Sequence, residues 1–393
     1  MLLGFKTELK LNNQQRTELL KHCGVARHAW NWGNGLCKQI LDHNRANPES
    51  KIKFPSAFDL HKWLVALVKT ENPWYYEASK SAPQEALRHL RSAWDRCFKK
   101  VSSSPNFKKK GRKDSFTLSG SGLRIKGDRA IRVPRIGTLR TYERLPQVSI
   151  KNVTISRTAD RWFISFRVET EPVETPKAVD VVGVDLGIKA LATLSTGEVF
   201  QGAMSYRRME AKLSRLQWLN RHKQIGSANW KKAQIKIARL HQQIANIRKD
   251  TLHKLTTYIA KNHGTVAIED LNVSGMMANH KLAKAIGDMG FYEFRRQLKY
   301  KCKLYGSELV VVDRWFPSSK TCSSCGVKKE TLTLSERVFE CNDCGFSLDR
   351  DLNAAINLRN VVSHTMSACG SGEADFSELK QEDFSLFASV SKS

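Results

Sequence analysis

Four cysteines in the C-terminal half of the chain have the types and spacing of a zinc-binding site. They form two Cys-x-x-Cys pairs with fifteen residues between the pairs, and a glycine follows each pair. The four residues are Cys322, Cys325, Cys341 and Cys344. Four thiolates complete a tetrahedron around Zn²⁺ and leave no open position, so we expect one structural zinc ion. A zinc ribbon as short as residues 319–347 would depend on this ion for folding.

Three acidic residues stand where predicted strands end or a helix begins. Asp185 ends an apolar run over residues 179–185, Glu269 ends a second run over 264–269, and Asp351 opens a predicted helix directly after the ribbon. Because such ends lie along one rim of an α/β sheet, we expect these three carboxylates to converge. Converged carboxylates without matching cations require a metal ion, and oxygen ligands favour Mg²⁺ or Mn²⁺. Two such ions about 4 Å apart support phosphodiester cleavage.

Four neighbouring acids are predicted to have other roles. Asp180 has an odd offset from the acid that ends its strand, so it points to the opposite face. Asp270 comes directly after the glutamate and points away for the same reason. Asp349 is a natural N-cap for the helix that follows the ribbon, and Asp313 is expected to be structural. A single acid at a strand end is usually a cap, so the metal-site hypothesis depends on three acids occurring together in a basic protein.

The charge of the chain indicates a polyanionic partner. It carries 65 Lys and Arg against 38 Asp and Glu, a formal net charge of +27 over 393 residues. Nucleic acid is the first candidate partner and an anionic membrane the second, although charge alone would also fit a ribosomal or chromatin-like protein. No run approaches the roughly 18 to 20 apolar residues of a membrane span, and the first residues lack a signal-peptide pattern, so we expect no membrane partner. The five remaining cysteines are scattered, which suggests reduced thiols in a cytoplasm.

The first part of the chain predicts a β structure that carries an inserted helical bundle. Residues 2–10 alternate like a strand, and helical periodicity then runs through residues 12–103, interrupted by prolines. Short strands are expected at 116–118, 123–125, 131–133, 148–150 and 162–168. We therefore predict a small β-barrel or curled sheet from residues 1–11 and 104–175. The tryptophans of the bundle are interpreted as core packing in preference to base stacking.

The second part predicts an α/β domain that the ribbon interrupts. A polar segment at 171–176 marks the boundary, and the domain would comprise residues 176–318 and 348–362. Apolar residues spaced 4-3-4-3 between 233 and 247 predict one arm of a helical hairpin. Residues 274–288 are expected to form a mobile loop, and the Ser-rich residues 363–393 a disordered tail.

Basic side chains in two places are candidate contacts for a nucleic-acid backbone. The first group lies in the run after Phe107, and the second on the predicted helical surface beyond residue 205. The candidates are Lys108, Lys109, Lys110, Arg112, Lys113, Arg207, Arg208, Lys231 and Lys232. These residues are selected on charge alone. The alternative is that the basic run is simply a solvated loop.

Several motifs together resemble TnpB, the OrfB-type protein of insertion sequences. They are Gly183-Val-Asp185-Leu-Gly187, Ile268-Glu269-Asp-Leu-Asn272, the four-cysteine ribbon, and Asp349-Arg-Asp351-Leu-Asn-Ala-Ala-Ile-Asn357. The resemblance covers residues 1–360. It implies a relative of the type V CRISPR effectors, with a RuvC-like nuclease domain of RNase H fold, a β-barrel wedge domain and a helical recognition lobe.

The resemblance also implies an activity. A guide RNA from the transposon end would direct Mg²⁺-dependent cleavage of double-stranded DNA beside a short motif, with Asp185, Glu269 and Asp351 as the acidic triad. The setting would be a prokaryotic cytoplasm, at the nucleoid. Two alternatives stay open: a transposase proper that uses the same acids, and a non-cleaving RNA-guided DNA-binding protein. Arg314 and Arg350 would either stabilise the transition state or pair with nearby acids.

Overall fold

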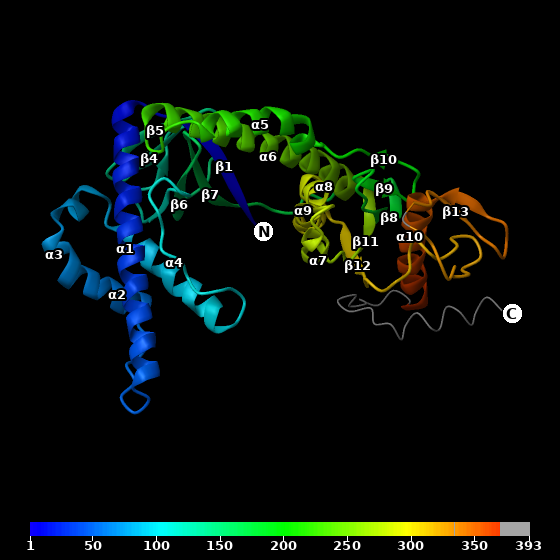
Figure 1. Ribbon diagram of the computed structural model, residues 1–393, viewed down its shortest axis with the longest axis horizontal. Coiled ribbons are helices and arrows are strands. Elements are labelled where there is room, and N and C mark those ends of the chain that lie inside the picture. Colours follow the sequence, from blue (N-terminus) through cyan, green and yellow to red (C-terminus); the bar gives the residue numbers. More distant parts are fainter. Residues whose placement is uncertain (334, 370–393) are drawn as a thin grey trace. The chain divides into compact units, whose positions relative to one another are not determined.

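The chain divides after Thr170 into unit 1, Met1–Thr170, and unit 2, which begins at Glu171. A computed structural model describes residues 1–333 and 335–369 (Figure 1). Residues 370–393 of the predicted tail lie outside the described residues. None of the helices that the structure describes is long and apolar enough to cross a lipid bilayer.

Unit 1 is built on a seven-stranded antiparallel sheet with the N-terminal strand at its centre. The strands are β1 (Leu2–Lys10), β2 (Ser115–Ser119), β3 (Arg124–Ile125), β4 (Ala130–Val133), β5 (Gly137–Thr141), β6 (Asn152–Thr158) and β7 (Arg161–Glu169). Their hydrogen-bonded order is β2-β6-β7-β1-β5-β4-β3. β1 pairs with β7 along most of its length and with β5 at Leu9 and Lys10, so it joins the two halves of the sheet. The N-terminal strand therefore belongs to this sheet, as predicted; closure into a barrel stays a prediction.

One predicted strand of unit 1 is wrong. Residues 148–150 form no strand, and strand pairing begins at β6, whose Val153 and Ile155 are fully buried. The strand β5 was not predicted, because Leu139 is its only large apolar residue. Pairing with both β1 and β4 holds it in the sheet, a tertiary contribution that its own composition does not signal.

The expected helices lie between β1 and β2. They are α1 (Asn13–Ala46), α2 (Ala57–Trp63), the π-helical turn η1 (Leu64–Val68), α3 (Lys69–Glu71), the 3₁₀ turn η2 (Pro73–Glu77) and α4 (Ser81–Phe98). Asn12 begins α1 with a capping box, accepting from the Gln15 backbone while the Gln15 side chain bonds the Asn12 N–H. Gly33 allows α1 and α4 to pack closely, because a Cβ there would lie 2.8 Å from a Leu87 methyl.

Unit 2 contains a five-stranded mixed sheet. Its strands are β8 (Val179–Asp185), β9 (Ala192–Leu194), β10 (Val199–Phe200), β11 (His263–Glu269) and β12 (Glu308–Val312), in the order β10-β9-β8-β11-β12. β8, β9 and β10 form an antiparallel meander, whereas β11 and β12 run parallel to β8. The carboxyl ends of the three parallel strands therefore meet at one edge of the sheet.

Helices cover both faces of this sheet. They are α5 (Ser205–Arg221), α6 (Ala228–Asn262), α7 (Val273–Ala278), α8 (Ala283–Met289), α9 (Phe291–Tyr305) and α10 (Arg350–Cys369). On β8 and β11, even-numbered residues such as Val184 and Ile268 pack in one core with residues of α6 and α9. Ala267 and Val312 pack on the opposite face with Leu358 of α10, and Figure 1 shows α10 beside β8. The sheet thus has an α6–α9 face and an α10 face.

Two predictions for unit 2 are wrong, and one is confirmed. Residues 274–288, predicted as a mobile loop, lie largely in α7 and α8, because Ile286 and Met289 are buried and Asp288 bonds the start of α5. The tail was predicted from residue 363, but α10 continues to Cys369. The predicted helical hairpin exists: α5 packs on α6 around Leu240 and Ile244.

Candidate metal sites

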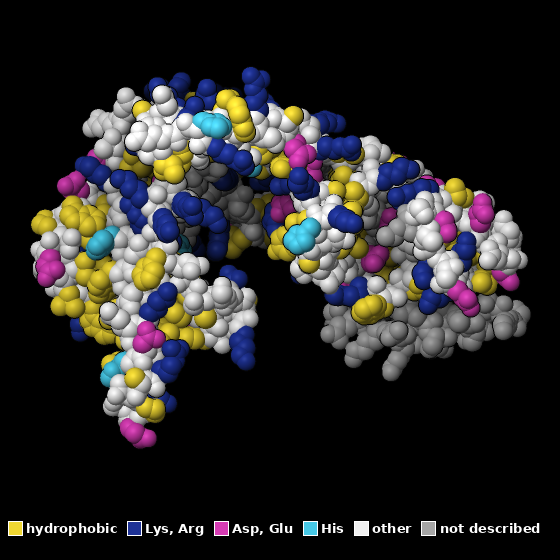
Figure 2. Space-filling model, viewed as in Figure 1, with side chains coloured by type: hydrophobic (Ala, Val, Ile, Leu, Met, Phe, Trp, Pro, Cys, Tyr) yellow, Lys and Arg dark blue, Asp and Glu magenta, His cyan; other side chains and the backbone are white. Residues whose placement is uncertain are grey.

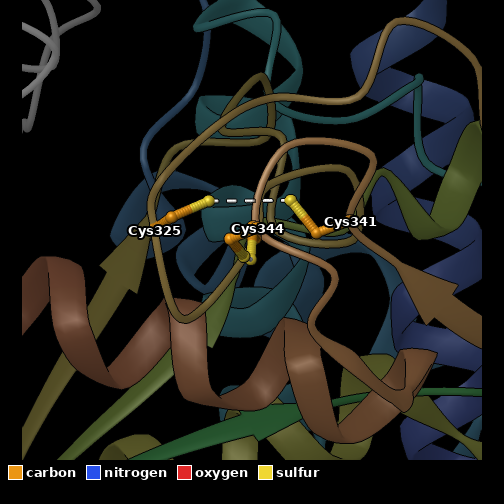
Figure 3. Close-up of side chains that lie close together, drawn as sticks. Cys325, Cys341 and Cys344 are labelled. Carbon is orange, nitrogen blue, oxygen red and sulfur yellow. Dashed lines mark hydrogen bonds between the residues drawn. The ribbon is translucent and has the colours of Figure 1, made fainter.

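The four cysteines of the predicted ribbon lie together in the structure. Their sulfur atoms are all within 4.8 Å of one another. The Sγ atoms of Cys322 and Cys344 are 3.7 Å apart. Those of Cys325 and Cys341 are 3.6 Å apart, as the dashed line in Figure 3 marks. A tetrahedral Zn²⁺ with Zn–S bonds of about 2.3 Å requires sulfur atoms about 3.8 Å apart. The four thiols are therefore grouped closely enough to hold a structural zinc ion.

Local backbone geometry prepares this arrangement. Gly326 and Gly345 have φ values of +78° and +72°, and each N–H bonds back to the carbonyl of the first cysteine in its pair. Glycine adopts this left-handed conformation with no steric cost, because it has no Cβ. Backbone N–H groups of Cys344 and Asp343 lower the pKa of the Cys341 thiol to about 7, whereas burial and contacts with the other thiols raise the pKa of Cys325.

The ribbon is tied to the start of α10 by two asparagines. Asn353 donates to the Thr321 carbonyl at 2.7 Å and accepts from the Ser323 N–H at 3.0 Å. Asn357 donates to the carbonyls of Ser318 and Thr321. Both asparagines are buried. The short strands β13 (Val338–Glu340) and β14 (Ser347–Asp349) complete the ribbon and lead directly into α10. Folding of the ribbon therefore fixes the position of the α10 N-terminus.

Strand register brings the first two acids together. β8 and β11 are paired in parallel, with Val184 opposite Ile268. The next position on each strand is Asp185 and Glu269, so these acids stand side by side at the carboxyl ends of adjacent strands. In-register residues of neighbouring strands point to the same face, about 5 Å apart. Both carboxylates lie on the α10 face, because the residues two positions earlier, Gly183 and Ala267, face that helix.

The third acid comes from α10. A Cβ on Gly183 would lie 1.9 Å from the Ala355 carbonyl oxygen, so glycine lets α10 pass against β8 with backbone in contact. Asp349 caps this helix by accepting from the N–H groups of Asp351 and Leu352, as predicted. Asp351 lies in the first turn, at the edge of the sheet where β8 and β11 end.

Electrostatics show that the three carboxylates interact. Burial, together with the charges of Asp351 and Glu269, raises the pKa of Asp185 to about 7, and the charge of Arg350 opposes this increase. Burial also raises the pKa of Glu269, and a hydrogen bond from Ser318 partly offsets this. A bound cation would neutralise the repulsion between these buried carboxylates. Their oxygen atoms are ligands of the kind that Mg²⁺ or Mn²⁺ prefers. The carboxylates of the three acids lie farther apart than the four thiols. Among the described residues, the four cysteines form the group whose ligand atoms all lie within 4.8 Å of one another.

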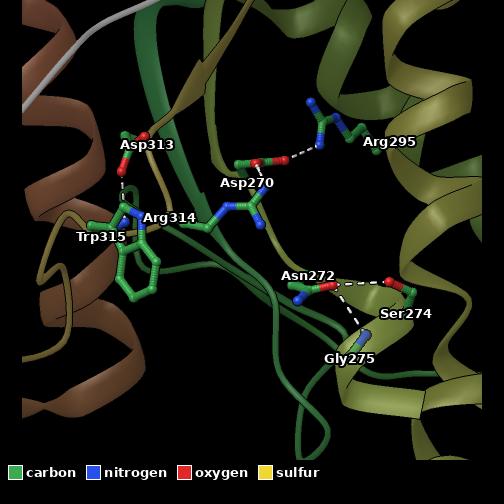
Figure 4. Close-up of polar contacts among 8 residues, drawn as sticks. All are labelled: Asp270, Asn272, Ser274, Gly275, Arg295, Asp313, Arg314 and Trp315. Carbon is green, nitrogen blue, oxygen red and sulfur yellow. Dashed lines mark hydrogen bonds and ion pairs between the residues drawn. The ribbon is translucent and has the colours of Figure 1, made fainter. Parts of the chain in front are cut away.

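The neighbouring acids have other partners. Asp180 is exposed near the start of β8. Asp313 accepts a 2.7 Å bond from the Trp315 N–H, a structural turn as expected (Figure 4). Asp270 pairs with both Arg295 and Arg314. Burial tends to raise the pKa of Asp270, but hydrogen bonds from the two arginines hold it below its usual value.

Arg350 is anchored to the ribbon. Its Nη1 donates to the carbonyls of Thr333 and Glu336, while its Nε lies 3.9 Å from an oxygen of Asp351. Its position next to the acids follows from this anchoring. Neither Ser318 nor Arg295 was predicted as part of the site, because each acts through a contact distant in sequence that no spacing pattern signals.

The nine candidate nucleic-acid contacts are all exposed. Figure 2 shows Lys and Arg side chains along α5 and α6. Lys108 differs from the rest, because its ammonium lies 3.8 Å from the centroid of the Trp30 ring and its backbone bonds the Asn31 side chain. These contacts dock the basic run on α1, so the charge of Lys108 already has a partner.

Comparison with known proteins gives consistent matches along the chain. A family model for IS605 OrfB, described as "Probable transposase", matches residues 165–280. A model described as "Cas12f1-like, TNB domain" matches residues 291–358. A "Helix-turn-helix domain" model matches residues 1–45, although this segment forms β1 and the single helix α1.

Two curated relatives match nearly the whole chain. Both are named "Putative RNA-guided DNA endonuclease". The protein from Escherichia coli K12, InsQ, is 35% identical over 97% of each chain. The protein from Streptomyces pristinaespiralis is 38% identical over 94% of this chain and 91% of its own.

Among solved structures, a Cas12f1–sgRNA–target DNA complex matches with a TM-score of 0.54 at 16% identity, over 88% of this chain and 82% of that chain. This likeness shows a fold of the Cas12f1 type. The chain therefore belongs to the OrfB or TnpB family of insertion-sequence proteins, relatives of the type V CRISPR effectors.

Proposed function

We propose that this protein is an RNA-guided DNA endonuclease of an insertion sequence, which hydrolyses phosphodiester bonds with the metal ions that its acidic triad binds. One observation carries the proposal: three acids from β8, β11 and α10 converge on one face of a mixed sheet. They do so in a chain whose relatives are named as RNA-guided endonucleases. The meander followed by two parallel strands supports a RuvC-like nuclease of RNase H fold, formed by residues 176–318 and 348–362.

Asp185, Glu269 and Asp351 would hold Mg²⁺ or Mn²⁺, which when bound activates water and stabilises the leaving oxygen. The chain's own residues set the geometry of this site. Strand pairing fixes two of the carboxylates, the Ser318 hydroxyl orients Glu269, and the zinc ribbon (residues 319–347) fixes the third through α10. Carboxylates that the fold holds rigidly would lower the cost of bringing the reacting groups together.

Guide RNA from the transposon end and double-stranded target DNA are the proposed partners. The Cas12f1 structure that this fold matches is a complex with sgRNA and target DNA. A net charge of +27 suits a protein that binds nucleic acid through backbone phosphates and shape. By the same analogy, residues 1–11 and 104–175 would be the wedge domain and residues 12–103 the recognition lobe. The eight basic candidates other than Lys108 are exposed, and among residues 1–333 and 335–369 their side chains have no ion-pair partner, so they could contact phosphates.

The two alternatives are weaker. A non-cleaving DNA-binding relative has no need of the triad, and here all three acids are present and converge. A transposase proper would catalyse strand exchange at the ends of the element, whereas the relatives are named as endonucleases.

The test is to purify the protein from cells that also transcribe its flanking DNA, and to sequence any bound RNA. The complex is then offered a library of matching duplexes in Mg²⁺. A discrete RNA with cleavage at matched sites supports the proposal. Bound RNA with target binding and no cleavage would favour the non-cleaving protein, and joining of DNA ends would favour the transposase. Cleavage without RNA would leave an unguided nuclease.

A further inference from the structure

Two arginines share one carboxylate directly beside Glu269. The two oxygens of Asp270 accept separate hydrogen bonds, one from Nη1 of Arg295 on α9 and one from Nη2 of Arg314 after β12 (Figure 4). We call Arg295 and Arg314 the arginine pair. Their side chains remain 44% and 43% exposed, whereas that of Asp270 is 25% exposed. The cluster therefore presents two accessible guanidinium groups on a mostly covered acid.

The pairing of two arginines with Asp270 would contribute little to the stability of the fold. Half-exposed ion pairs add little to folding stability, because solvent screens the charges and ordering long side chains costs entropy. Each guanidinium carries five N–H donors, and in the part of the chain that the structure describes each bonds Asp270 through one nitrogen. Most of the donors of both arginines thus remain available to a ligand.

The arginine pair opens onto the same cleft as Glu269. This cleft has a volume of about 250 Å³ and is lined by Glu269, both arginines, Phe291 and Tyr292, among others. Phe291 is buried, whereas Tyr292 is 71% exposed. Two cations and an exposed aromatic ring therefore line one cavity on the α6–α9 face, and this cavity reaches the end of β11 where Glu269 stands.

We propose that this cleft binds the DNA strand next to the scissile phosphodiester, with the arginine pair holding a backbone phosphate and Tyr292 offering a stacking surface to a base. Asp270 is a positioning residue that keeps the two guanidinium groups at the cleft wall. This inference rests on the proposed nuclease function. Its ligand is the phosphate of a single-stranded DNA segment, independent of sequence.

Charge explains why the site would need such a wall. Three carboxylates repel an incoming phosphodiester until metal ions neutralise them. Two arginines against one aspartate leave one excess positive charge on the strand's path to Glu269. One planar guanidinium group can donate two parallel hydrogen bonds to two oxygens of a phosphate, whereas a lysine ammonium cannot. Base stacking on tyrosine adds affinity without sequence preference.

The test removes the proposed contact from both sides. The purified protein–RNA complex is given substrate strands in which single phosphates near the cut are replaced by neutral methylphosphonate. For the wild-type protein we expect one position at which this change lowers kcat/KM about tenfold or more. In the variant with both R295Q and R314Q, the same methylphosphonate should cost less than twofold further. An equal loss in the wild-type protein and the double variant would overturn the proposal.

Matched variants separate this contact from general effects. R296Q removes the next cation on α9, which pairs with Glu293, and should retain the wild-type methylphosphonate profile. Replacing the pair by lysines keeps charge without the planar geometry, so activity should lie between wild type and the glutamine variant. The lysine variant also keeps the test valid if the glutamine variant folds poorly.

A binding readout keeps this proposal distinct from the nuclease proposal. Affinity for a fluorescent single-stranded oligonucleotide is measured against salt without Mg²⁺. Each lost phosphate contact reduces the slope of log K on log salt by about 0.7. A smaller slope for R295Q with R314Q supports the contact even if no cleavage occurs, and an unchanged slope refutes it. D270N should bind the oligonucleotide at least as tightly as wild type, because it removes a negative charge, while kcat falls. If the oligonucleotide affinity and kcat of D270N rose together or fell together, the positioning role of Asp270 would be contradicted.

Discussion

Replacing Asp185 by asparagine should stabilise the metal-free protein while it abolishes cleavage. The pKa of Asp185 is about 7 in the folded protein, against 3.8 for the free side chain. A raised carboxyl pKa means that the folded state holds a proton that the unfolded state releases, so stability is greatest below about pH 4 and falls as pH rises to about 7. With 1.36 kcal/mol per pKa unit, the cost is roughly 2 kcal/mol at pH 5 and roughly 4 kcal/mol at pH 8.

Asparagine keeps the shape of the side chain but carries no charge, so it escapes this cost. The stability gain of D185N should therefore grow by about 2 kcal/mol between pH 5 and pH 8. Amide hydrogen exchange in β8 and β11 measures the unfolding free energy of unit 2 without interference from unit 1. The experiment is run without Mg²⁺ and with zinc retained. Added Mg²⁺ should reverse the order of stability, because it favours the wild-type site.

The matched control is D180N, which changes an exposed acid on the same strand and should alter stability by less than about 0.5 kcal/mol at either pH. A D185N gain that is the same at pH 5 and pH 8 would refute the reasoning, because it would not come from the charge. Destabilisation at pH 8 would show that the three carboxylates do not repel one another in the folded protein.

Three further substitutions test how the site is built. G183A should destabilise unit 2 by about 1–3 kcal/mol and lower cleavage, because a Cβ there meets the α10 backbone, whereas G4A has free space around its Cβ and should behave as wild type in the same thermal unfolding assay. C341S should reduce the zinc content from one ion per chain toward zero and, by releasing α10, lower cleavage; full activity without zinc would contradict the link between ribbon and triad. D288A should lower the free energy of unfolding in urea by about 1–2 kcal/mol, because it leaves the Ser205 hydroxyl and two α5 N–H groups without their acceptor. An unchanged free energy of unfolding would mean that solvent replaces the carboxylate.

The sequence predicts the four-cysteine cluster and the side-by-side positions of Asp185 and Glu269, because local rules decide both. Cysteine spacing fixes the ribbon, and the alternation of strand side chains fixes which face Asp185 and Glu269 share. Asp349 is predicted as a cap because it stands directly before a helix, where a carboxylate can accept hydrogen bonds from the first N–H groups. The catalytic role of the triad itself remains a proposal.

What escapes the sequence depends on long-range contacts. The arginine pair meets Asp270 only because α9 and the end of β12 flank β11, and no local pattern shows this. Residues 274–288 read as a loop because their glycines and polar residues hide the buried Ile286 and Met289. The strand β5 is likewise held by its partners, and the contact between Lys108 and Trp30 joins residues far apart in the sequence that no charge pattern connects.

The central claim is that three acids from separate elements act as one catalytic unit in guided cleavage. The most direct measurement compares D185N, E269Q and D351N with wild type on one guide-matched duplex, recording both target affinity and cleavage rate in Mg²⁺. The account predicts that each variant binds RNA and target within about threefold of wild type, while the cleavage rate falls by a factor on the order of 100 or more. A variant that cleaves at the wild-type rate would contradict it.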